Sequence, residues 1–324
     1  MNSYSRSVHI PVMLDEVLRA LQPQDGKIYV DGTFGAGGYT RAILESAGCT
    51  VYAVDRDPEA YARAVAMAKD FPGRLIPLHG CFGSLAELLG AAQIKHIHGL
   101  VLDIGVSSLQ LSTPGRGFSF QAEGPLDMRM SKAGESAADV VNTASEERLA
   151  DIIFTYGEER ASRRIAKKIV MTRAAAPIET TLQLADIVHS VVPQHPKLKT
   201  DTATKTFQAL RIHVNDELHE LEKVLDAAER LLLPEGRLVV VSFHSLEDWR
   251  VKHFLKERAG KRGGNSRHLP AAHAGPDPTF AIQDGQALKA SDAEIASNPR
   301  ARSARLRGGI RTAAPAWQEE MRYA

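Results

Sequence analysis

Two acidic residues and a cluster of glycines follow the first two apolar runs of this chain. Asp31 ends the first run, Gly35, Gly37 and Gly38 come next, and Asp55 ends the second run. Glycines allow the backbone to approach a ligand closely, and an acid at the end of a second strand can accept hydrogen bonds from ribose hydroxyls. The pattern therefore predicts a nucleotide-type site at one edge of an α/β sheet.

The glycine spacing narrows the choice of ligand. A dinucleotide fingerprint read from Gly35 requires a third glycine at position 40, where Thr40 stands, so a dehydrogenase is the weakest interpretation. An acid before the glycines suits a ligand with a positive end and no pyrophosphate. S-adenosylmethionine fits because it carries an ammonium, a sulfonium and an adenosine ribose. The alternative is an ordinary βα turn that binds nothing, which would make the two acids and three glycines a coincidence.

Composition places the chain among globular proteins. Of its 324 residues, 44% are hydrophobic and 24% are charged, and this length allows one large domain or two. No apolar run reaches the length of a signal peptide core or a membrane span. The two cysteines, Cys49 and Cys81, are too few for a disulfide framework and lack zinc-site spacing. We therefore expect a cytoplasmic protein with no membrane partner and no metal.

Basic residues are concentrated in two places, although the net charge is only +1. The first stretch contains Arg160, Arg163, Arg164, Lys167 and Lys168, and the second contains Arg300, Arg302, Arg305, Arg307 and Arg311. Such local clusters can bind phosphates while the whole chain stays near neutral. The alternative for either cluster is a solvated helix face or a solvated tail.

The order of apolar runs predicts an α/β fold. Short β-branched runs at 27–31, 50–55, 74–79, 99–103 and 237–243 are typical of strands buried on both faces. Helical patterns at 39–47, 58–68 and 82–89 separate the first four. We therefore expect a doubly wound, Rossmann-like parallel sheet of the kind found in class I S-adenosylmethionine-dependent methyltransferases.

A long helical segment interrupts this rhythm. Residues 113–135 resemble a loop, and helices are predicted at 137–142, 145–156, 161–174, 181–192 and 204–233. We therefore expect an all-helical insertion domain at 113–215 within a sheet domain formed by 1–112 and 216–324. Near the end, the runs 279–283 and 286–290 flank Asp284-Gly285 and predict a hairpin, and 303–311 predicts a last, antiparallel strand before a basic C-terminal tail.

Ligands of open α/β sheets bind at the carboxyl ends of the strands, which assigns roles to the residues there. Asp31 is expected to reach the ligand ammonium directly or through water, and the three glycines to line the methionine end. Asp55 is expected to hold the ribose. Phe82, after the third strand, is placed to pack on adenine or to be a core aromatic.

Asp103 ends the fourth strand, where the transferable methyl group would point. An exocyclic nucleobase amine is a poor nucleophile because its lone pair is delocalised into the ring. A carboxylate that accepts a hydrogen bond from this amine would raise its electron density and orient the attack. The alternative is that Asp103 only caps the next helix.

A series of short blocks adds a family resemblance. In order they are HIPVMLDE (9–16), DGTFGAGG (31–38), DRDP (55–58), DIGVSS (103–108), RGFSF (116–120), GPLDMRM (124–130), YGEER (156–160), TFQALRI (206–212), SFHSLED (242–248) and NPRARS (298–303). In this set and order the chain resembles, over nearly its whole length, the bacterial small-subunit ribosomal RNA cytosine-N4 methyltransferases called RsmH or MraW.

The resemblance implies a cofactor, a reaction and site residues. The cofactor is S-adenosylmethionine, and the reaction is methylation of the N4 amine of one cytidine in the decoding region of 16S ribosomal RNA. Carried over by position, the cofactor residues are Gly37, Gly38, Tyr39, Asp55, Phe82, Asp103 and Gln110. Tyr39 departs from the histidine often found in the family, which puts the detail of that contact in doubt.

The substrate side is less specific in the sequence. The target base must be unpaired or flipped out, and Phe118 and Phe120 could stack on it or could anchor their loop. His244 could contact base or phosphate, or be structural. The expected phosphate contacts are Arg163, Arg164, Lys167, Lys168, Arg300, Arg302 and Arg305. The partner is then free rRNA or an assembled small subunit, and the insertion helices serve either that RNA or a homodimer.

Two other functions compete with this one. The first is a methyltransferase that acts on a small molecule or on another RNA, which the site motifs alone do not exclude. The second is a ribosome-assembly factor that binds RNA without catalysis, against which the glycines, Asp55 and Asp103 argue.

Overall fold

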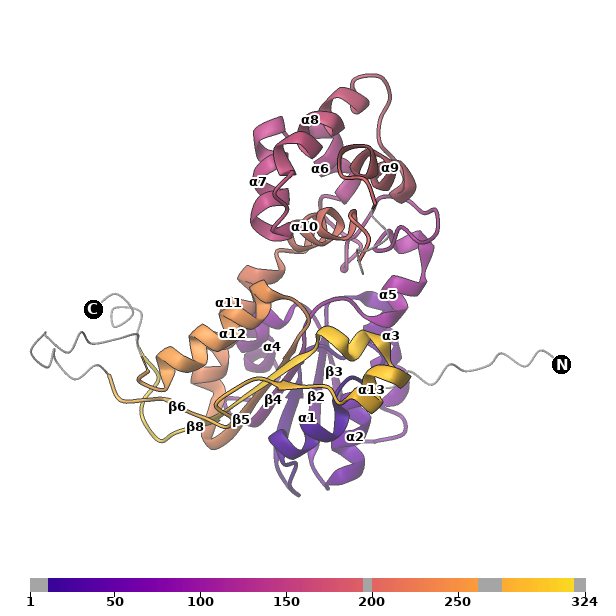
Figure 1. Cartoon of the computed structure of the whole chain (residues 1–324). Helices are drawn as coiled ribbons and strands as arrows, with labels where there is room; N and C mark the ends of the chain where they lie inside the picture. Colours follow the sequence, from indigo (N-terminus) through magenta and orange to yellow (C-terminus); the bar gives the residue numbers. More distant parts are fainter. Residues whose placement is uncertain (1–10, 195–199, 262–275, 318–324) are drawn as a thin grey trace, which may run out of the picture. The chain divides into compact units, whose positions relative to one another are not determined.

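The structure, a computed structural model, describes residues 11–194, 200–261 and 276–317, and the chain divides into two compact units (Figure 1). The sheet unit comprises Met1–Gly105 and His219–Ala324, and the helical unit comprises Val106–Leu218. The sequence analysis placed the corresponding boundaries at residues 113 and 215. The first two residues of the 9–16 block lie outside the described part.

The described part of the sheet unit holds one eight-stranded sheet in the order β3-β2-β1-β4-β5-β8-β6, with β7 paired to β8. The strands are β1 (Ile28–Asp31), β2 (Thr50–Asp55), β3 (Leu75–His79), β4 (Ile97–Asp103), β5 (Leu232–Ser242), β6 (Phe280–Ile282), β7 (Leu288–Lys289) and β8 (Arg305–Arg311). The first five are parallel and β8 is antiparallel to β5, which confirms the predicted sheet. The strand order changes direction between β1 and β4, and α/β proteins bind ligands at such a switch point.

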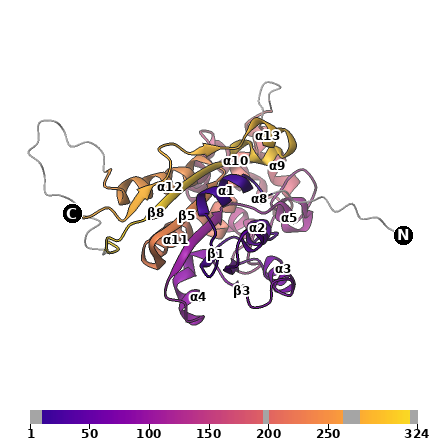
Figure 2. The ribbon, with the colours of Figure 1, turned by 90° about the horizontal axis from the view of Figure 1, so that it is seen from below.

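Helices cover both faces of this sheet, as a doubly wound fold requires (Figures 1 and 2). One core contains buried side chains of α1 (Leu14–Leu21), α2 (Gly38–Ser46) and α3 (Pro58–Met67), with α13 (Asp292–Ser297) packed against it. The other contains side chains of α4 (Leu85–Ala91), α11 (Glu217–Leu231) and α12 (Ser245–Arg258). Val30, Leu100 and Leu102 are completely buried between these layers, which explains the unbroken apolar runs of their strands.

The predicted hairpin at Asp284-Gly285 is wrong. Strands β6 and β7 do not pair with each other; both pair antiparallel with β8, β6 along Gly309–Arg311 and β7 along Arg305–Leu306. They therefore form one interrupted edge strand, and Asp284-Gly285 belongs to the excursion between its two halves. The two flanks do not pair because the long strand β8 pairs with both of them.

The basic C-terminal segment is also not a tail. Its residues form the 3-10 helix η3 (Pro299–Ser303) and β8, which lies inside the sheet between β5 and β6. Leu306 is buried, and a Cβ at Gly309 would lie 2.6 Å from Leu255 Cδ2, so this arginine-rich strand packs closely against α12. The last, antiparallel strand predicted at 303–311 is thus confirmed, and only the interpretation of the same segment as a tail is wrong.

The predicted helix at 204–233 is two helices. Helix α10 (Thr204–Asn215) ends where Asp216 adopts a left-handed conformation with φ 50°, and α11 begins at Glu217. Strand β5 then begins earlier than predicted, at Leu232. Its pairing with β4 skips from Leu232 to Arg237, so the intervening Leu-Pro-Glu-Gly segment forms an irregularity in the strand.

The helical unit has its own core. The described elements of this unit are α5 (Ser108–Ser112), the 3-10 helix η2 (Pro114–Arg116), α6 (Ala137–Thr143), α7 (Glu146–Gly157), α8 (Ser162–Arg173), α9 (Thr181–Val191) and α10. Ile153, Ile165 and Leu210 are among the fully buried side chains that α7, α8 and α10 contribute. Ser145 caps the start of α7, because its side chain accepts a hydrogen bond from Arg148 N.

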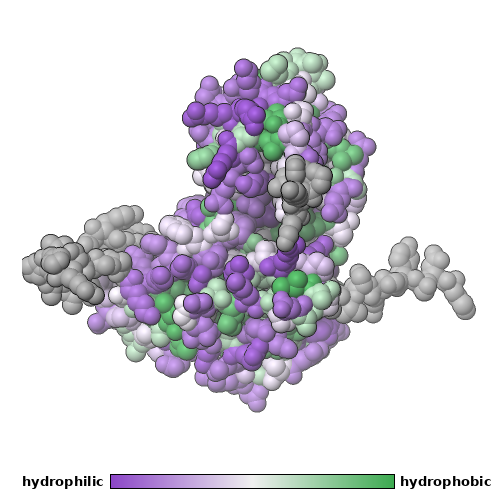
Figure 3. Space-filling model, viewed as in Figure 1, coloured by the Kyte–Doolittle hydropathy of each residue, from purple (hydrophilic) through white to green (hydrophobic). Residues whose placement is uncertain are grey.

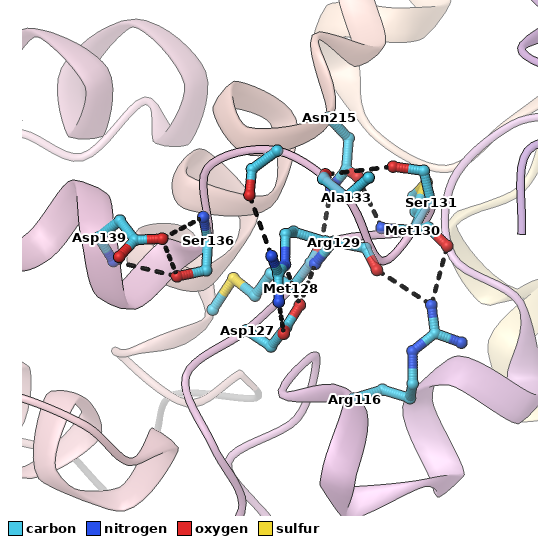
Figure 4. A network of polar contacts seen from close by, with 11 residues as sticks. Arg116, Asp127, Met128, Arg129, Met130, Ser131, Ala133, Ser136, Asp139 and Asn215 are labelled. Atoms are coloured by element: carbon cyan, nitrogen blue, oxygen red, sulfur yellow. Dashed lines mark hydrogen bonds and ion pairs between the residues drawn. The ribbon is translucent and has the colours of Figure 1, made fainter.

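The loop that precedes α6 is fixed by polar contacts (Figure 4). Arg116, 7% exposed, donates to the carbonyl oxygens of Arg129 and Met130, each at 3.0 Å. The Asn215 side chain accepts from Met130 N at 2.9 Å and donates to Met128 O at 2.8 Å. These bonds satisfy the buried backbone of the loop, so it is ordered without regular secondary structure.

Candidate active site at the carboxyl edge of the sheet

Asp31 lies at the end of β1, beneath the glycine turn formed by residues 32–38. Its carboxylate accepts hydrogen bonds from Thr33 N at 3.1 Å and from Thr40 Oγ1 at 2.7 Å. Burial raises the pKa of Asp31 to about 6. Both oxygens thus have partners within the sheet unit, so Asp31 holds the turn and the start of α2 in place.

The glycine turn depends on backbone conformations that other residues rarely adopt. Gly35 and Gly37 have φ values of 54° and 83°. A Cβ at Gly37 would lie 2.6 Å from Phe34 Cζ, and one at Gly38 would lie 2.2 Å from Pro11 Cγ. Gly37 and Gly38 therefore have no room for a side chain, and they are needed for the shape of the turn before any ligand binds.

Asp55, at the end of β2, ties this turn to the neighbouring strand. Its two carboxylate oxygens accept from Gly35 N at 2.8 Å and from Asp57 N at 2.9 Å. Burial raises the pKa of Asp55, and the two backbone donors oppose this shift. Since the residue is half-buried, it lies at the surface of the carboxyl edge, where a ribose contact was expected.

Tyr39 and Phe82 both lie at this edge, in different surroundings. The Tyr39 ring is buried, and its hydroxyl donates a hydrogen bond to Val12 O, so it fastens the segment before α1. Phe82 begins the 3-10 helix η1 (Phe82–Ser84) and packs, half-buried, against the core that contains α4. A Cβ built at Gly32 would lie 3.5 Å from Phe82 Cβ, which places Phe82 beside the glycine turn.

Asp103 is the most unusual group of the edge. Its backbone N donates to Thr33 Oγ1 at 2.6 Å, which joins the end of β4 to the turn after β1. Its Oδ1 is buried and has no hydrogen-bond partner within the described residues. Burial, helped by the nearby carboxylates of Asp31 and Glu247, raises the pKa of Asp103 to about 8. A strongly shifted acid with an unused oxygen at a switch point is typical of a functional site.

Glu247, like Asp31, lies near Asp103, and we call these three carboxyl side chains the acidic group. Glu247 was not among the site residues predicted from the sequence. It is fully buried in the first turn of α12, and its Oε2 accepts from Phe243 N at 2.9 Å and from His244 N at 3.3 Å. Its Oε1 lies 2.9 Å from His244 Nε2. An acid three residues after the start of a helix is a capping signal, which could have pointed to it. His244, only 11% exposed at its side chain, thus has a structural partner.

Gln110, Phe118 and Phe120 belong to the helical unit. Gln110 Oε1 accepts from Ser107 N at 3.0 Å and forms the capping box of α5. Phe118 is 7% exposed within the helical core, and the Phe120 ring lies 4.7 Å from that of Phe207. These aromatic contacts favour the anchoring role for Phe118 and Phe120 over stacking on a base.

Some of the basic residues expected to bind phosphate are exposed, whereas others form contacts within the protein. The side chains exposed to solvent are Arg163, Arg164, Lys167 and Lys168 on α8, and Arg300 and Arg302 on η3, whereas Arg305 is half-buried. In the view of Figure 3 the visible face of the helical unit is largely hydrophilic. Within the Arg300–Arg311 cluster, two residues correct the phosphate prediction: Arg307 pairs with Asp248, and Arg311 is buried and donates to Glu229 O at 2.8 Å.

Neither a metal nor a membrane site emerges. Among residues 11–194, 200–261 and 276–317, no group of three histidine, cysteine, aspartate or glutamate side chains could hold a metal ion. None of the helices in these same ranges is long and apolar enough to cross a membrane.

Comparison with known proteins assigns the chain to a family. The model of the MraW methylase family matches residues 6–310. The chain belongs to this family. S-adenosylmethionine is therefore its cofactor, and the sheet unit is the Rossmann-like class I methyltransferase sheet that the sequence predicted.

Curated members of the MraW methylase family are similar over almost the whole chain. Ribosomal RNA small subunit methyltransferase H of Hyphomonas neptunium is 56% identical over 312 residues, which cover 96% of this chain and 91% of that protein. The protein of the same name from Rhodospirillum centenum is 58% identical over 310 residues, 96% of this chain and 94% of its own.

Proposed function

We propose that this protein methylates the exocyclic N4 amine of a cytidine in the decoding region of 16S ribosomal RNA. The observation that carries the proposal is Asp103, whose unused, buried carboxyl oxygen lies at the switch point of a methyltransferase sheet. The name of the relatives, ribosomal RNA small subunit methyltransferase H, supports the small subunit as the substrate. Such a protein would act in the cytoplasm on free rRNA or on the assembled subunit.

The residues at the carboxyl edge fit the cofactor. We assign Asp55 to the ribose, Phe82 to the adenine, and the turn with Gly35, Gly37 and Gly38 to the methionine end. When bound, S-adenosylmethionine supplies a methyl group activated by a sulfonium. Asp31 and Tyr39 support the turn through their own hydrogen bonds, and we retain Asp31 as the acid assigned to the ligand ammonium. We retain Gln110, from the helical unit, as a further contact.

Asp103 would act on the substrate amine. As a carboxylate, it can accept a hydrogen bond from the amine N–H, which raises electron density on nitrogen and orients the lone pair. The cytidine nitrogen would form a bond to the methyl carbon as the bond from that carbon to the sulfonium breaks and leaves a neutral thioether. The nitrogen would then lose a proton, for which Asp103 Oδ1 is the adjacent acceptor. Because the pKa of Asp103 is about 8 in this structure, the carboxylate form becomes more abundant as the pH rises through that value. A cationic ligand beside it would lower that pKa.

RNA contacts would come from exposed cations of each unit. Arg163, Arg164, Lys167 and Lys168 lie on α8, and Arg300, Arg302 and the half-buried Arg305 follow α13. They would neutralise phosphates and position the RNA, while the edge of the sheet selects the base. His244 lies beside the acidic group at the start of α12 and would approach the base from there.

The proposal is tested by the chemical identity of the product. Small ribosomal subunits that lack the modification, free 16S rRNA and large-subunit rRNA would be incubated with the protein and labelled S-adenosylmethionine. The RNA would then be digested and its nucleosides read by mass spectrometry. We expect N4-methylcytidine from the small-subunit substrates alone. Another methylated nucleoside, or equal transfer to large-subunit rRNA, would contradict the proposal.

A further inference from the structure

One face of α12 exposes an aromatic ring together with three basic side chains. Lys252 and His253 lie three and four residues after Trp249, and Lys256 lies four and three residues after them, which places all of them along one side of the helix. All four are exposed, and Trp249 is 58% exposed. We call these four residues the α12 stripe. Such a large exposed aromatic surface on a charged helix needs an explanation.

The acids of α12 do not neutralise the stripe. Asp248 accepts two hydrogen bonds from Arg307, at 2.7 and 2.9 Å, and Glu257 lies 2.9 Å from Arg258 Nη1. Glu247 is buried at the acidic group. Across the described ranges, neither lysine of the stripe forms an ion pair. The stripe therefore presents positive charge to the solvent.

A shallow depression extends this positive surface beside the helix. It lies between α12 and the edge strands, and its lining includes Lys252, Lys256 and Arg307. Arg307 is paired with Asp248, so the two lysines are the cations left to face Asp284, which also lines the depression. This balance suits a phosphate group, which carries negative charge and several hydrogen-bond acceptors.

The Trp249 ring is held in place although it is exposed. The His253 ring stacks on it with centroids 5.0 Å apart, and the Arg250 guanidinium lies 6.0 Å from its centroid. Arg250 is in turn fixed by Glu222, at 2.8 Å. An aromatic ring with restricted motion loses little entropy when a base stacks on it, which is how proteins bind unpaired nucleotides.

The stripe starts close to the candidate active site. Helix α12 begins at Ser245, directly after His244, and the first turn of the helix carries Glu247. From Ser245 to Lys256 the helix extends for roughly 16 Å. All of these residues belong to the sheet unit. A strand of RNA with its target base at Asp103 could therefore continue along α12.

We propose that the α12 stripe binds unpaired RNA next to the target nucleotide. Trp249 stacks on a neighbouring base, and Lys252 and Lys256 neutralise phosphates. This inference rests on the proposed function, since it extends the binding site of the same RNA. A second copy of the chain is a poorer occupant, because two such stripes facing each other would bring like charges together.

The test measures RNA binding separately from methyl transfer. The full-length protein would be titrated into a fluorescent, unstructured 12-nucleotide RNA at several salt concentrations. Trp249→Ala is expected to weaken binding roughly 5- to 100-fold, and Trp249→Phe to restore most of it. The double variant Lys252→Ala/Lys256→Ala is expected to reduce the slope of log K against log salt by about 1.4, for two phosphates at about 0.7 each.

The matched control is Lys69→Ala/Lys95→Ala, which removes two exposed lysines of the sheet unit away from α12. We expect it to bind RNA like the wild type. Calorimetric titration with S-adenosylhomocysteine and thermal melting would show that every variant is folded and retains its cofactor site.

Three results would overturn the inference: unchanged RNA affinity and salt slope in the stripe variants, equal losses in the control, or a wild-type dimer that Trp249→Ala converts to a monomer in light scattering. Failure of the proposed function can be distinguished from failure of this inference. In that case the wild type would transfer no methyl group to small-subunit RNA, whatever the RNA-binding measurements give.

Discussion

Replacing Asp103 by asparagine should stabilise the protein. The pKa of Asp103 is about 8 in the folded chain against an ordinary value of 3.8, because burial and two neighbouring carboxylates disfavour its charge. Between these two values the folded state binds a proton that the unfolded state has released, so stability falls as the pH rises. A neutral side chain of the same shape removes this dependence.

The size of the effect follows from the same two pKa values. Each unit of difference is worth about 1.4 kcal/mol, so the penalty grows by about 4 kcal/mol between pH 5 and pH 8 and is complete above the folded pKa. Asp103→Asn should therefore raise the free energy of unfolding relative to the wild type, by an amount that increases over this range.

The assay is urea unfolding at pH 5, 6.5 and 8, followed by tryptophan fluorescence. Both tryptophans, Trp249 and Trp317, lie in the sheet unit, so the signal reports the unit that contains Asp103. The control is Asp292→Asn, an exposed carboxylate on α13 in the same unit, which should leave the pH dependence unchanged. A variant that is no more stable than the wild type at pH 8, or a gain that does not grow with pH, would refute the reasoning.

Three further changes have defined outcomes. Gly38→Ala places a Cβ against Pro11 and should cost about 1–3 kcal/mol and weaken S-adenosylhomocysteine binding in calorimetry, whereas Gly90→Ala, with open space around it, should do neither. Glu247→Gln removes a negative charge near Asp103 and therefore lowers the pKa of Asp103. The rise of kcat/KM at alkaline pH should then move to lower pH, and an unchanged pH profile of kcat/KM would exclude Asp103 as the titrating group. Arg258→Ala leaves a buried carboxylate on α11 unpaired and should cost about 3–5 kcal/mol in urea unfolding, and a loss under 1 kcal/mol would contradict that ion pair.

The sequence predicts the parallel part of the sheet well, for a physical reason. Strands buried on both faces have unbroken apolar sequences, and a turn follows each of them. Strands β1 to β4 therefore end where the sequence predicted, at Asp31, Asp55, His79 and Asp103. The edge of the sheet was harder. The last strand predicted at 303–311 is confirmed as β8, but its pairing with both flanks of the predicted hairpin joins residues that local spacing does not bring together.

The residues of the candidate site were also predictable only in part. The acids and glycines were visible because they follow the strands, but their partners within the fold were not. The hydrogen bond of Tyr39 to Val12 joins residues far apart in the chain, and the acidic group of Asp103 and Glu247 forms only when β4 and β5 become neighbours. Distances of this kind depend on the register of the sheet, which local spacing does not specify.

The most direct test of the account is the single-turnover rate of methyl transfer to small ribosomal subunits lacking the modification, for the wild type and Asp103→Asn. Cofactor affinity would be measured in parallel. We predict that Asp103→Asn slows N4-methylcytidine formation by roughly 10²- to 10⁴-fold while the variant remains folded and binds RNA. A wild-type rate in the variant would contradict the assignment of Asp103 to the substrate amine.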